Sequence, residues 1–360
     1  MLDARDPALV ALDPASDALR AALRVGEEID DDVALVVTTS GTTGAPKGAL
    51  LTAAALTASA TATHNRLGGP GSWLLALPPH HIAGLQVLVR SALAGSTPVE
   101  LDVSAGFDVA QLPAATRRLA SGRRYTSLVA TQLAKALTNP AAAAALAELD
   151  AVLLGGGPAP QGVLDAAAAA GIAVVRTYGM SETAGGCVYD GVPLDGVRVR
   201  VADGGRIALG GATLAKGYRN PVHPDPFAER GWFRTDDLGA LDGAGVLTVL
   251  GRADDAISTG GLTVLPQLVE AALGSHPAVG DCAVFGLADD RLGQRVVAAV
   301  VVAAGRPAPT LDALRAHVTR ALDATAAPRE MHIVDALPRR GIGKVDRMAL
   351  VRRFAGSAGQ

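Results

Sequence analysis

The segment Thr38-Thr39-Ser40-Gly41-Thr42-Thr43-Gly44-Ala45-Pro46-Lys47-Gly48 follows directly after an apolar run, Val33 to Val37. Its glycines let the backbone approach a ligand closely, and its hydroxyl and free N–H groups can donate to phosphate oxygens. Lys47 adds a positive charge. This chemistry predicts a loop that holds the phosphates of a nucleoside triphosphate.

The spacing of this loop differs from the P-loop pattern G-x-x-x-x-G-K-[ST]. Gly41 and Gly44 stand too close together, and Gly48 follows Lys47 where the pattern needs Ser or Thr. A switch-type ATPase is therefore disfavoured. Taken alone, a cluster of Ser, Thr and Gly is also typical of an ordinary loop, so the rest of the chain has to decide.

Composition narrows the class of protein. The chain has 360 residues, 49% of them apolar, and a formal net charge of -3. This length predicts two or three domains with a large core, and the absence of a dense Lys/Arg cluster disfavours nucleic acid as a partner. Cys187 and Cys282 lie far apart and without metal-ligand spacing, which fits a reducing cytoplasm.

No targeting or membrane segment is expected. Asp3, Arg5 and Asp6 are not followed by the apolar region of a signal peptide, and runs such as Val296 to Ala304 are shorter than the roughly 18 residues of a membrane span. The expected location is the cytoplasm.

Short β-branched runs alternate with alanine-rich helical stretches from residue 33 to about 250, which indicates an α/β fold. Most of these runs end in a glycine or polar cluster, where open α/β sheets bind ligands. Helices are expected at Ala141 to Ala145 and Ala166 to Ala170. The predicted strands are Trp73 to Leu77, Ser127 to Ala130, Ala151 to Leu154 and Ala173 to Thr177.

After Pro193, glycine-punctuated short strands such as Arg206 to Leu209 and Val246 to Leu250 predict a small β-rich subdomain. A break follows at residues 251–255, and a separate small α+β domain is expected beyond it. Its predicted helices are Pro266 to Leu273 and Leu311 to Leu322, and its predicted strands are Asp281 to Phe285, Val296 to Val302 and Met331 to Val334.

The order of these pieces resembles the adenylate-forming superfamily of acyl-CoA synthetases, aryl-CoA ligases, luciferases and peptide-synthetase adenylation domains. The motifs that carry the resemblance are Thr39 to Gly48, Gly155-Gly156-Gly157-Pro158, Tyr178-Gly179-Met180-Ser181-Glu182-Thr183, Phe233 to Gly239, Arg252 to Asp254 and Pro338 to Arg347. The resemblance implies an adenylation domain over 1–253, with the β-rich subdomain at about 193–253, and a mobile lid domain over 254–360 hinged at Asp254.

The resemblance also implies roles for single residues. Lys344, Thr183, Glu182 and His81 form the expected catalytic set, with Glu182 as the Mg²⁺ ligand. The expected ATP and AMP contacts are Thr39, Ser40, Gly41, Thr42, Thr43, Gly44, Lys47, Gly155, Gly156, Gly157, Pro158, Tyr178, Gly179, Met180, Asp237 and Arg252. The acid substrate is assigned to His81, Arg90 and Ser181, and the CoA tunnel to Gly260 and Gly261.

In this chemistry a carboxylate attacks the α-phosphate of ATP, pyrophosphate departs, and a thiol displaces AMP from the acyl-adenylate. Charge grows on phosphoryl oxygens, which Lys344 would stabilise. Plainer readings exist for Asp237 as a turn residue and Arg252 as a surface arginine. Ser181 nearly matches the hydrolase elbow G-x-S-x-G, but the final glycine is absent.

Three departures from the superfamily pattern are visible. The usual Thr-Gly-Asp reads Thr235-Asp236-Asp237, and an Ile-Lys pair after the hinge reads Ile257-Ser258. About thirty residues precede the phosphate loop, whereas most relatives place far more there. The expectation is a compact ligase, with a damaged homologue as the alternative, and a homodimer that covers the exposed apolar surface.

The segment Pro78 to Arg90 bears on the substrate. A helix from His81 would turn Ile82, Leu85 and Val89 toward an acyl pocket, and Arg90 would pair with a second carboxylate. The alternative is a core helix with a solvent-facing arginine. This segment and the short length of the chain together resemble those of the 2-succinylbenzoate-CoA ligases of menaquinone synthesis, especially the short actinobacterial form.

Three other functions stay open on sequence alone. Another aryl- or acyl-CoA ligase would use the same residues on a different acid. An adenylation enzyme that loads a carrier protein would need a phosphopantetheinyl protein in place of free CoA. A non-catalytic nucleotide-binding homologue is disfavoured by the presence of Lys344, Glu182 and Thr183.

Overall fold

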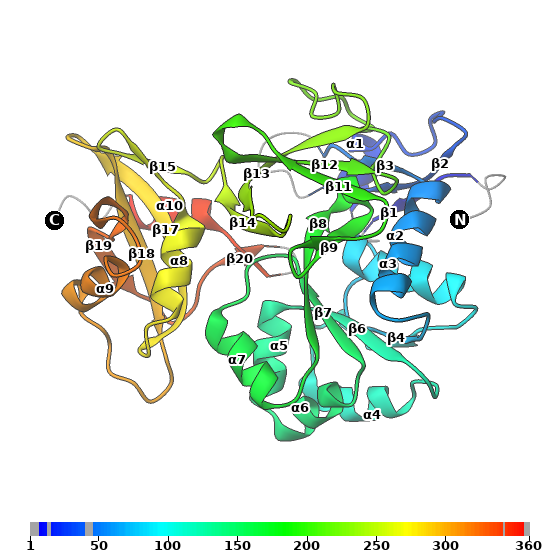
Figure 1. Ribbon diagram of the computed structural model, residues 1–360, viewed down its shortest axis with the longest axis horizontal. Coiled ribbons are helices and arrows are strands. Elements are labelled where there is room, and N and C mark those ends of the chain that lie inside the picture. The colour runs from blue at the N-terminus through cyan, green and yellow to red at the C-terminus, as the bar shows by residue number, and fades with distance from the viewer. Residues whose placement is uncertain (1–6, 13–15, 40–45, 341–342, 356–360) are drawn as a thin grey trace.

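The β-branched runs form a seven-stranded sheet in the larger part of the molecule (Figure 1). This computed structural model describes residues 7–12, 16–39, 46–340 and 343–355. The strands are Ser72–Leu75 (β4), Val99–Glu100 (β5), Arg124–Val129 (β6), Ala151–Gly155 (β7), Val174–Met180 (β8), Gly185–Tyr189 (β9) and Val192–Pro193 (β10). Their order across the sheet is β10-β9-β8-β7-β6-β4-β5.

The strands from β4 to β8 pair in parallel, whereas β9 and β10 pair antiparallel at one edge. Parallel pairing requires crossover connections, and helices supply them. These helices are Ile82–Leu93 (α3), Leu112–Arg117 (α4), Ala130–Leu137 (α5), Pro140–Ala147 (α6) and Gln161–Ala169 (α7), and the helix Ala53–Arg66 (α2) leads into β4. Both alanine tracts lie in helices, α6 and α7, as predicted from the helix propensity of alanine.

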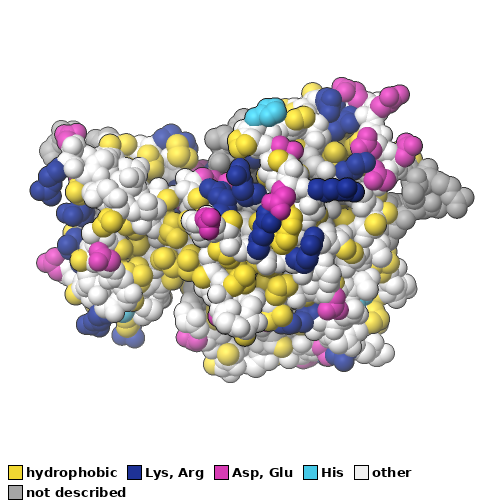
Figure 2. All heavy atoms as spheres, turned by 45° about the horizontal axis from the view of Figure 1, so that its top comes forward, with side chains coloured by type: hydrophobic (Ala, Val, Ile, Leu, Met, Phe, Trp, Pro, Cys, Tyr) yellow, Lys and Arg dark blue, Asp and Glu magenta, His cyan; other side chains and the backbone are white. Residues whose placement is uncertain are grey.

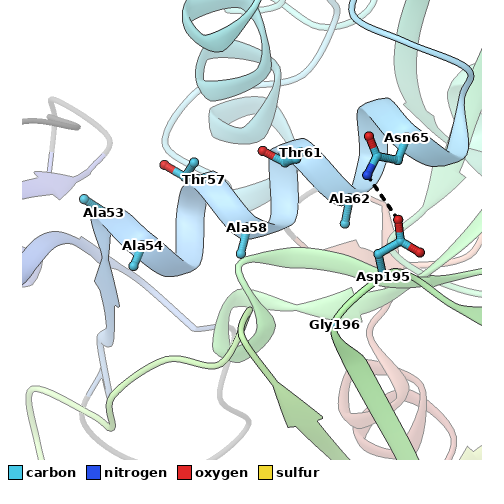
Figure 3. Close-up of a pocket in the computed structure, with 9 residues that line it drawn as sticks. All are labelled: Ala53, Ala54, Thr57, Ala58, Thr61, Ala62, Asn65, Asp195 and Gly196. Carbon is cyan, nitrogen blue, oxygen red and sulfur yellow. Dashed lines mark hydrogen bonds between the residues drawn. The ribbon is translucent and has the colours of Figure 1, made fainter.

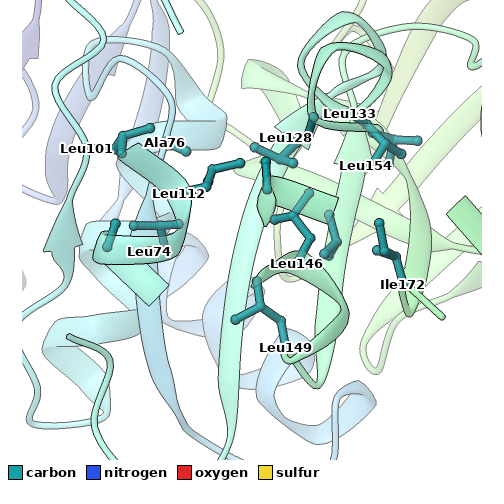
Figure 4. Packing of buried hydrophobic residues seen from close by; sticks show 14 of the residues in the cluster. Leu74, Ala76, Leu101, Leu112, Leu128, Leu133, Leu146, Leu149, Leu154 and Ile172 are labelled. Atoms are coloured by element: carbon teal, nitrogen blue, oxygen red, sulfur yellow. The ribbon is translucent and has the colours of Figure 1, made fainter. Parts of the chain in front are cut away.

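Side chains alternate between the two faces of this sheet, and each face has its own core. Leu74, Leu128 and Leu154 point to one side, where they pack with α4, α5 and α6 (Figure 4). Trp73 and Tyr125 point to the other side, with ring centroids 4.9 Å apart. Burial of each such side chain contributes about 1.5–3 kcal/mol to the free energy of unfolding. This packing keeps the carboxyl ends of the strands together at one edge of the sheet.

Two smaller sheets flank this edge. The apolar run before the phosphate loop is buried throughout, and forms the centre of a three-stranded sheet. Its strands are Leu9–Ala11 (β1), Val33–Val37 (β2) and Ala49–Thr52 (β3), and the short helix Asp17–Ala22 (α1) lies between the first two in sequence. The predicted β-rich segment forms a four-stranded antiparallel sheet of Val197–Val201 (β11), Arg206–Gly211 (β12), Trp232–Leu241 (β13) and Leu247–Arg252 (β14).

The C-terminal residues build the smaller part, drawn yellow to red in Figure 1. Its five-stranded sheet contains Ile257–Thr259 (β15), Leu262–Val264 (β16), Val279–Asp289 (β17), Gly293–Val302 (β18) and Glu330–Ile333 (β19). Its helices are Pro266–Gly274 (α8), Leu311–Val318 (α9) and Arg347–Phe354 (α10). A two-stranded hairpin, Arg339–Arg340 (β20) and Lys344–Val345 (β21), precedes α10.

Several predicted boundaries in this part were wrong, including the start of β18, which lies at Gly293 and not at Val296. Strand β17 continues past Phe285 to Asp289, because Gly286 pairs with Val296 of β18 without interrupting the ladder. Helix α9 ends at Val318, four residues before the predicted Leu322. None of the helices in the described ranges is long and apolar enough to cross a membrane.

Candidate active site

The carboxyl ends of β7 and β8 bring two predicted motifs together. Gly155 ends β7, and a Cβ there would lie 2.5 Å from Oγ1 of Thr177, so only glycine fits. At Gly179 a Cβ would lie 2.2 Å from the carbonyl oxygen of Gly185. Gly157 faces open space, with nothing within 4 Å of an added Cβ. The backbone is therefore close-packed behind the motifs and accessible in front of them.

Tyr178 on β8 reaches across to the β-rich subdomain. Its hydroxyl donates to Oδ2 of Asp237 at 2.7 Å. Thr235 fixes the loop, since its Oγ1 accepts from the Asp237 N–H at 3.0 Å. Burial raises the pKa of Asp237, and the hydrogen bond from Tyr178 and the charge of Arg252 oppose that shift. Asp237 is thus a largely buried, oriented acceptor within β13 and not an exposed turn residue.

Arg252, at the end of β14, lies among three carboxylates. It forms a bidentate pair with Asp254, at 2.8 and 2.6 Å, and its Nη1 lies 3.7 Å from Oδ1 of Asp237. Burial lowers the pKa of Arg252, but Asp254, Asp237 and Asp236 outweigh that effect and raise it overall. Arg252 is partly exposed, but its three carboxylate neighbours distinguish it from an isolated surface arginine.

Glu182 follows β8 in the short 3₁₀ turn Ser181–Thr183 and is buried. Its Oε1 accepts a 2.6 Å hydrogen bond from Tyr218, whose ring lies under the ammonium group of Lys47 at 5.5 Å. Burial raises the pKa of Glu182, while Tyr218 and the charges of Lys47 and Lys344 lower it. The carboxylate and both lysines therefore belong to one electrostatic unit.

Lys344 brings the smaller part of the molecule into this unit. It begins β21, and it lies close enough to Arg252, Asp237 and Glu182 for their charges to shift its pKa. Desolvation by the surrounding protein and the charge of Arg252 lower the pKa of Lys344, whereas the carboxylates of Asp237 and Glu182 raise it. The residue is nevertheless accessible to water. The structure thus brings together residues from five separate segments of the chain.

Hydrogen bonds and ion pairs of two arginine side chains hold the hairpin that carries Lys344. Arg339 donates from Nη1 to the carbonyl oxygen of Gly343 at 2.6 Å, and its Nη2 lies 2.5 Å from Oδ2 of Asp281 on β17. Arg340 pairs with Asp346 at 3.3 Å. Arg339 thus joins the two strands of the hairpin to the five-stranded sheet.

Arg347 anchors the other side of Lys344. Its guanidinium donates to both oxygens of Glu270 on α8 at 2.7 and 2.8 Å, and to Oδ2 of Asp255 at 3.0 Å. Gln267 of α8 donates to the same Asp255 oxygen at 3.0 Å. The residue after the predicted hinge, Asp255, is therefore bonded to the smaller part of the molecule.

The phosphate loop is described only at its two ends. Ser40, Gly41, Thr42, Thr43 and Gly44 lie outside the described residues. At one end Ser181 donates to the carbonyl oxygen of Thr38 at 3.3 Å. Oγ1 of Thr39 is buried and has no hydrogen-bond partner in the described part of the chain, as expected of a group kept for a ligand.

Thr183 is fully buried, and its hydroxyl is engaged locally. Oγ1 lies 2.7 Å from the carbonyl oxygen of Gly185 and accepts from the Met180 N–H at 3.0 Å. These bonds fix the turn that presents Glu182. Its predicted catalytic role stays a prediction, because a phosphate contact needs the hydroxyl to leave these partners.

Helix α3 begins after His81, as predicted, and His81 is half-buried with its ring beside that of His80 at 4.5 Å. Leu85 and Val89 pack into the core against β2, β3 and α2, so the stripe is mainly structural. Arg90 lies nine residues further on, about 13 Å along the helix axis.

Arg90 is only 3% exposed, so the solvent-facing alternative is wrong. Its guanidinium carbon lies 4.9 Å from the ring centroid of Trp73, and Nη2 donates to the Tyr189 hydroxyl at 3.3 Å. Nε has no partner, and no carboxylate pairs with Arg90 within the described ranges. Burial lowers the pKa of Arg90. A buried guanidinium without a counter-ion is costly.

Two other features lie away from the cluster around Lys344. Gly260 and Gly261 form the exposed turn between β15 and β16, with φ of +59° and +81°. A groove of about 650 Å³ runs along the outer side of α2 (Figure 3). Its lining is Ala53, Ala54, Thr57, Ala58, Thr61, Ala62, Asn65, Asp195 and Gly196. Such small, mostly neutral side chains carry no phosphate chemistry.

Sequence reasoning missed the segment Lys216 to Asn220. Tyr218 orients Glu182, and Asn220 donates from Nδ2 to the carbonyl oxygen of Pro46 at 2.7 Å, which holds the end of the phosphate loop. Arg219 is buried and donates to carbonyl groups of residues 23–28. The only available signal was a polar cluster after Gly217, which is typical of many loops.

Comparison with known proteins agrees with this geometry. Residues 5–219 match the model for "AMP-binding enzyme", and residues 268–344 match "AMP-binding enzyme C-terminal domain". A protein of Mycobacterium tuberculosis named probable 2-succinylbenzoate–CoA ligase is 80% identical over 362 residues, which cover 100% of this chain and 94% of that protein.

Two solved structures of o-succinylbenzoate CoA synthetase from Bacillus subtilis are also similar. The complex with the acyl-adenylate intermediate OSB-AMP has a TM-score of 0.76 and 32% identity, over 88% of this chain and 69% of that one. The complex with ATP and a magnesium ion has a TM-score of 0.73 and 31% identity, over 89% and 71%. The chain belongs to the AMP-binding enzyme family.

Proposed function

We propose that this protein uses ATP to activate 2-succinylbenzoate as an acyl-adenylate and then transfers the acyl group to CoA. The proposal depends mainly on one observation, which is that Lys344 lies close to Glu182, Asp237 and Arg252. The names of the relative from Mycobacterium tuberculosis and of the Bacillus subtilis synthetase support the choice of acid. The product belongs to menaquinone synthesis if the acid is 2-succinylbenzoate.

In the first step a carboxylate oxygen of the acid attacks the α-phosphorus of ATP, and the bond to the leaving pyrophosphate breaks. Negative charge grows on the α-phosphoryl oxygens and on pyrophosphate. Lys344 and Lys47 supply the opposing charges from two sides, and Asp237 and Arg252 would fix the ribose. Most of the rate gain then comes from positioning and electrostatics.

A magnesium ion fits this site as an ion shared with the substrate. The described residues contain no group of three or more His, Cys, Asp or Glu side chains that could hold a metal alone. Mg²⁺ characteristically uses one or two carboxylates plus substrate phosphates. Glu182, held in place by Tyr218, would supply that carboxylate, and the ion would neutralise charge on the departing pyrophosphate.

The buried position of Arg90 is explained if its guanidinium binds the second carboxylate of the acid. 2-Succinylbenzoate keeps one carboxylate after the other is activated, and a guanidinium fork matches that group in geometry and charge. Arg90 has a free Nε and no acidic partner in the part of the chain described here. We assign it to this carboxylate, with His81 and Ser181 nearer to the reacting end.

The thioester step would use a second orientation of the smaller part. The thiol sulfur of CoA attacks the adenylate carbonyl and gives up its proton to solvent, and AMP leaves with the electrons of the broken carbon–oxygen bond. Rotation at Asp254 would move Lys344 out and bring the Gly260–Gly261 turn in, where two missing side chains leave room for the pantetheine arm.

The test is Mg²⁺-dependent pyrophosphate release from ATP with a panel of carboxylic acids, with and without CoA. Mass spectrometry identifies the products. Succinylbenzoyl-CoA is the expected product, and Lys344→Ala is the negative control. Adenylate formation with a different acid would show that 2-succinylbenzoate is not the substrate. Transfer only to a carrier protein would show that CoA is not the acceptor. Absence of pyrophosphate with every acid would overturn the proposal.

A further inference from the structure

The outer face of the β-rich subdomain carries a group of arginines that the reaction above does not use. Arg198 and Arg200 alternate on β11, and the register pairs them with Gly210 and Ala208 of β12. Those residues pair in turn with Trp232 and Arg234 of β13. Because directly paired residues share a face, these side chains lie on one side of the sheet.

Small residues in the middle strand leave room for close packing on this face. The guanidinium carbons of Arg198 and Arg200 lie 4.9 and 4.2 Å from the ring centroid of Trp232. The opposite side of β13 carries Phe233 and Thr235, which are buried. The outer side chains Arg198, Arg200, Arg206, Trp232 and Arg234 are called the arginine face below. Figure 2 shows Lys and Arg side chains gathered over this part.

The arginine face has more positive than negative charge. Arg200 pairs with Glu229, and Arg206 with Asp236 at 2.9 Å. Besides the Trp232 ring, Arg198 contacts the carbonyl oxygen of Gly231 at 3.4 Å, and within the described residues neither Arg198 nor Arg234 has an acidic partner. Both are exposed. Two arginines therefore stay uncompensated, on a chain whose formal net charge is -3.

This face adjoins the candidate active site. Asp236 points to the arginine face, and its neighbour Asp237 points to Tyr178. Arg252 contacts both carboxylates, at 3.8 and 3.7 Å, and it also holds Asp254. Arg234 precedes Asp236 by two residues on the same face of β13, and Arg198 lies at the level of the next residue on that face, Trp232.

We propose that the arginine face binds the phosphates of the CoA nucleotide during thioester formation. This inference rests on the proposed function and names a site for its second substrate. CoA carries its thiol on a long flexible arm, and a pyrophosphate and a 3′-phosphate at the other end. Guanidinium groups match phosphate oxygens in geometry and charge. The arm spans the edge of β13, and the phosphates meet Arg234 and Arg198.

The test is the double variant Arg198→Gln/Arg234→Gln. Its KM for CoA should rise about tenfold, with less dependence on salt, because two charge-assisted contacts are lost. Its KM for pantetheine, which has the thiol arm but no nucleotide, should match that of the native protein. Arg118→Gln, an exposed arginine at the end of α4, is the matched control.

An unchanged KM for CoA, or equal increases for CoA and pantetheine, would overturn the proposal. If no acid supports thioester formation, calorimetry with adenosine 3′,5′-bisphosphate tests the face without any chemistry. Binding that weakens at least about fivefold in the double variant supports it. Equal binding to both proteins, or no binding to the native protein, contradicts it. Failure of this site is thereby distinguished from failure of the proposed reaction.

Discussion

The hydroxyl of Tyr178 donates to Oδ2 of Asp237 across 2.7 Å, between residues 59 positions apart in the chain. This bond joins the end of the parallel sheet to the β-rich subdomain. Burial raises the pKa of Tyr178, and the neighbouring Asp237 raises it further, so the hydroxyl keeps its proton. Asp237, the proposed acceptor for a ribose, is therefore oriented before any nucleotide arrives.

Replacement of Lys344 separates the two half-reactions. Lys344→Ala should slow adenylate formation about 10²- to 10³-fold, because a positive charge near the developing phosphoryl charge is lost. Attack of CoA on adenylate supplied from outside should continue at nearly the native rate. Rapid-quench measurement of each half-reaction checks this prediction, and equal loss in both would contradict the division of labour between Lys344 and the Gly260–Gly261 turn.

The alkaline limb of the pH profile should report Lys344. Desolvation by the surrounding protein and the charge of Arg252 lower the pKa of Lys344 below that of an ordinary lysine. The charged form is needed, so kcat/KM for ATP should fall as pH rises through that lowered pKa. Pyrophosphate release as a function of pH measures the limb. If it persists unchanged in Lys344→Ala, another group is responsible.

The bond between Arg339 and Asp281 should position Lys344. Arg339→Gln removes the contacts to Asp281 and to Gly343, so the hairpin loses its connection to β17. Adenylate formation should fall about tenfold with unchanged KM for ATP, since charge-assisted hydrogen bonds contribute about 1.5–3 kcal/mol.

Three further measurements decide whether Arg339 acts through position. Arg339→Lys should recover part of the rate. Asp281→Asn combined with Arg339→Gln should cost less than the sum of the single changes, because both remove one interaction. Thioester formation from supplied adenylate is the internal reference, and a matching loss there would indicate general damage to the domain.

Arg90 should discriminate between acids. Arg90→Met keeps much of the buried volume and removes the charge, so KM for 2-succinylbenzoate should rise about tenfold or more while KM for ATP stays near native. Benzoate, which lacks the second carboxylate, is the control substrate and should be unaffected. Thermal unfolding should show no loss of stability. Equal increases in both KM values would remove Arg90 from the acid site.

The sequence predicted those parts of the site that lie in local patterns. A glycine or polar cluster after a β-branched run placed Gly155 and Tyr178 at the carboxyl edge of the sheet, because parallel strands end there together. It also indicated the α/β class and the helix that follows His81. These features depend on neighbours within a few residues.

The features that were missed depend on contacts between distant segments. Tyr218 meets Glu182 across 36 positions, and no spacing rule links them. The burial of Arg90 follows from the packing of α3 against Trp73 and Tyr189, which helical periodicity cannot reveal. The continuation of β17 past Gly286 depends on its partner strand.

The bonds of Arg252 and Arg347 on either side of Asp254 have a consequence for how such enzymes diversify. Arg347 and Gln267 bind Asp255 to the smaller part, so the chain can turn only in the short stretch just before it. The angle of turning is then a local backbone property, independent of helix α3 and its arginine. If the smaller part rotates at Asp254 as proposed, substitutions around helix α3 can change the choice of acid without altering that rotation.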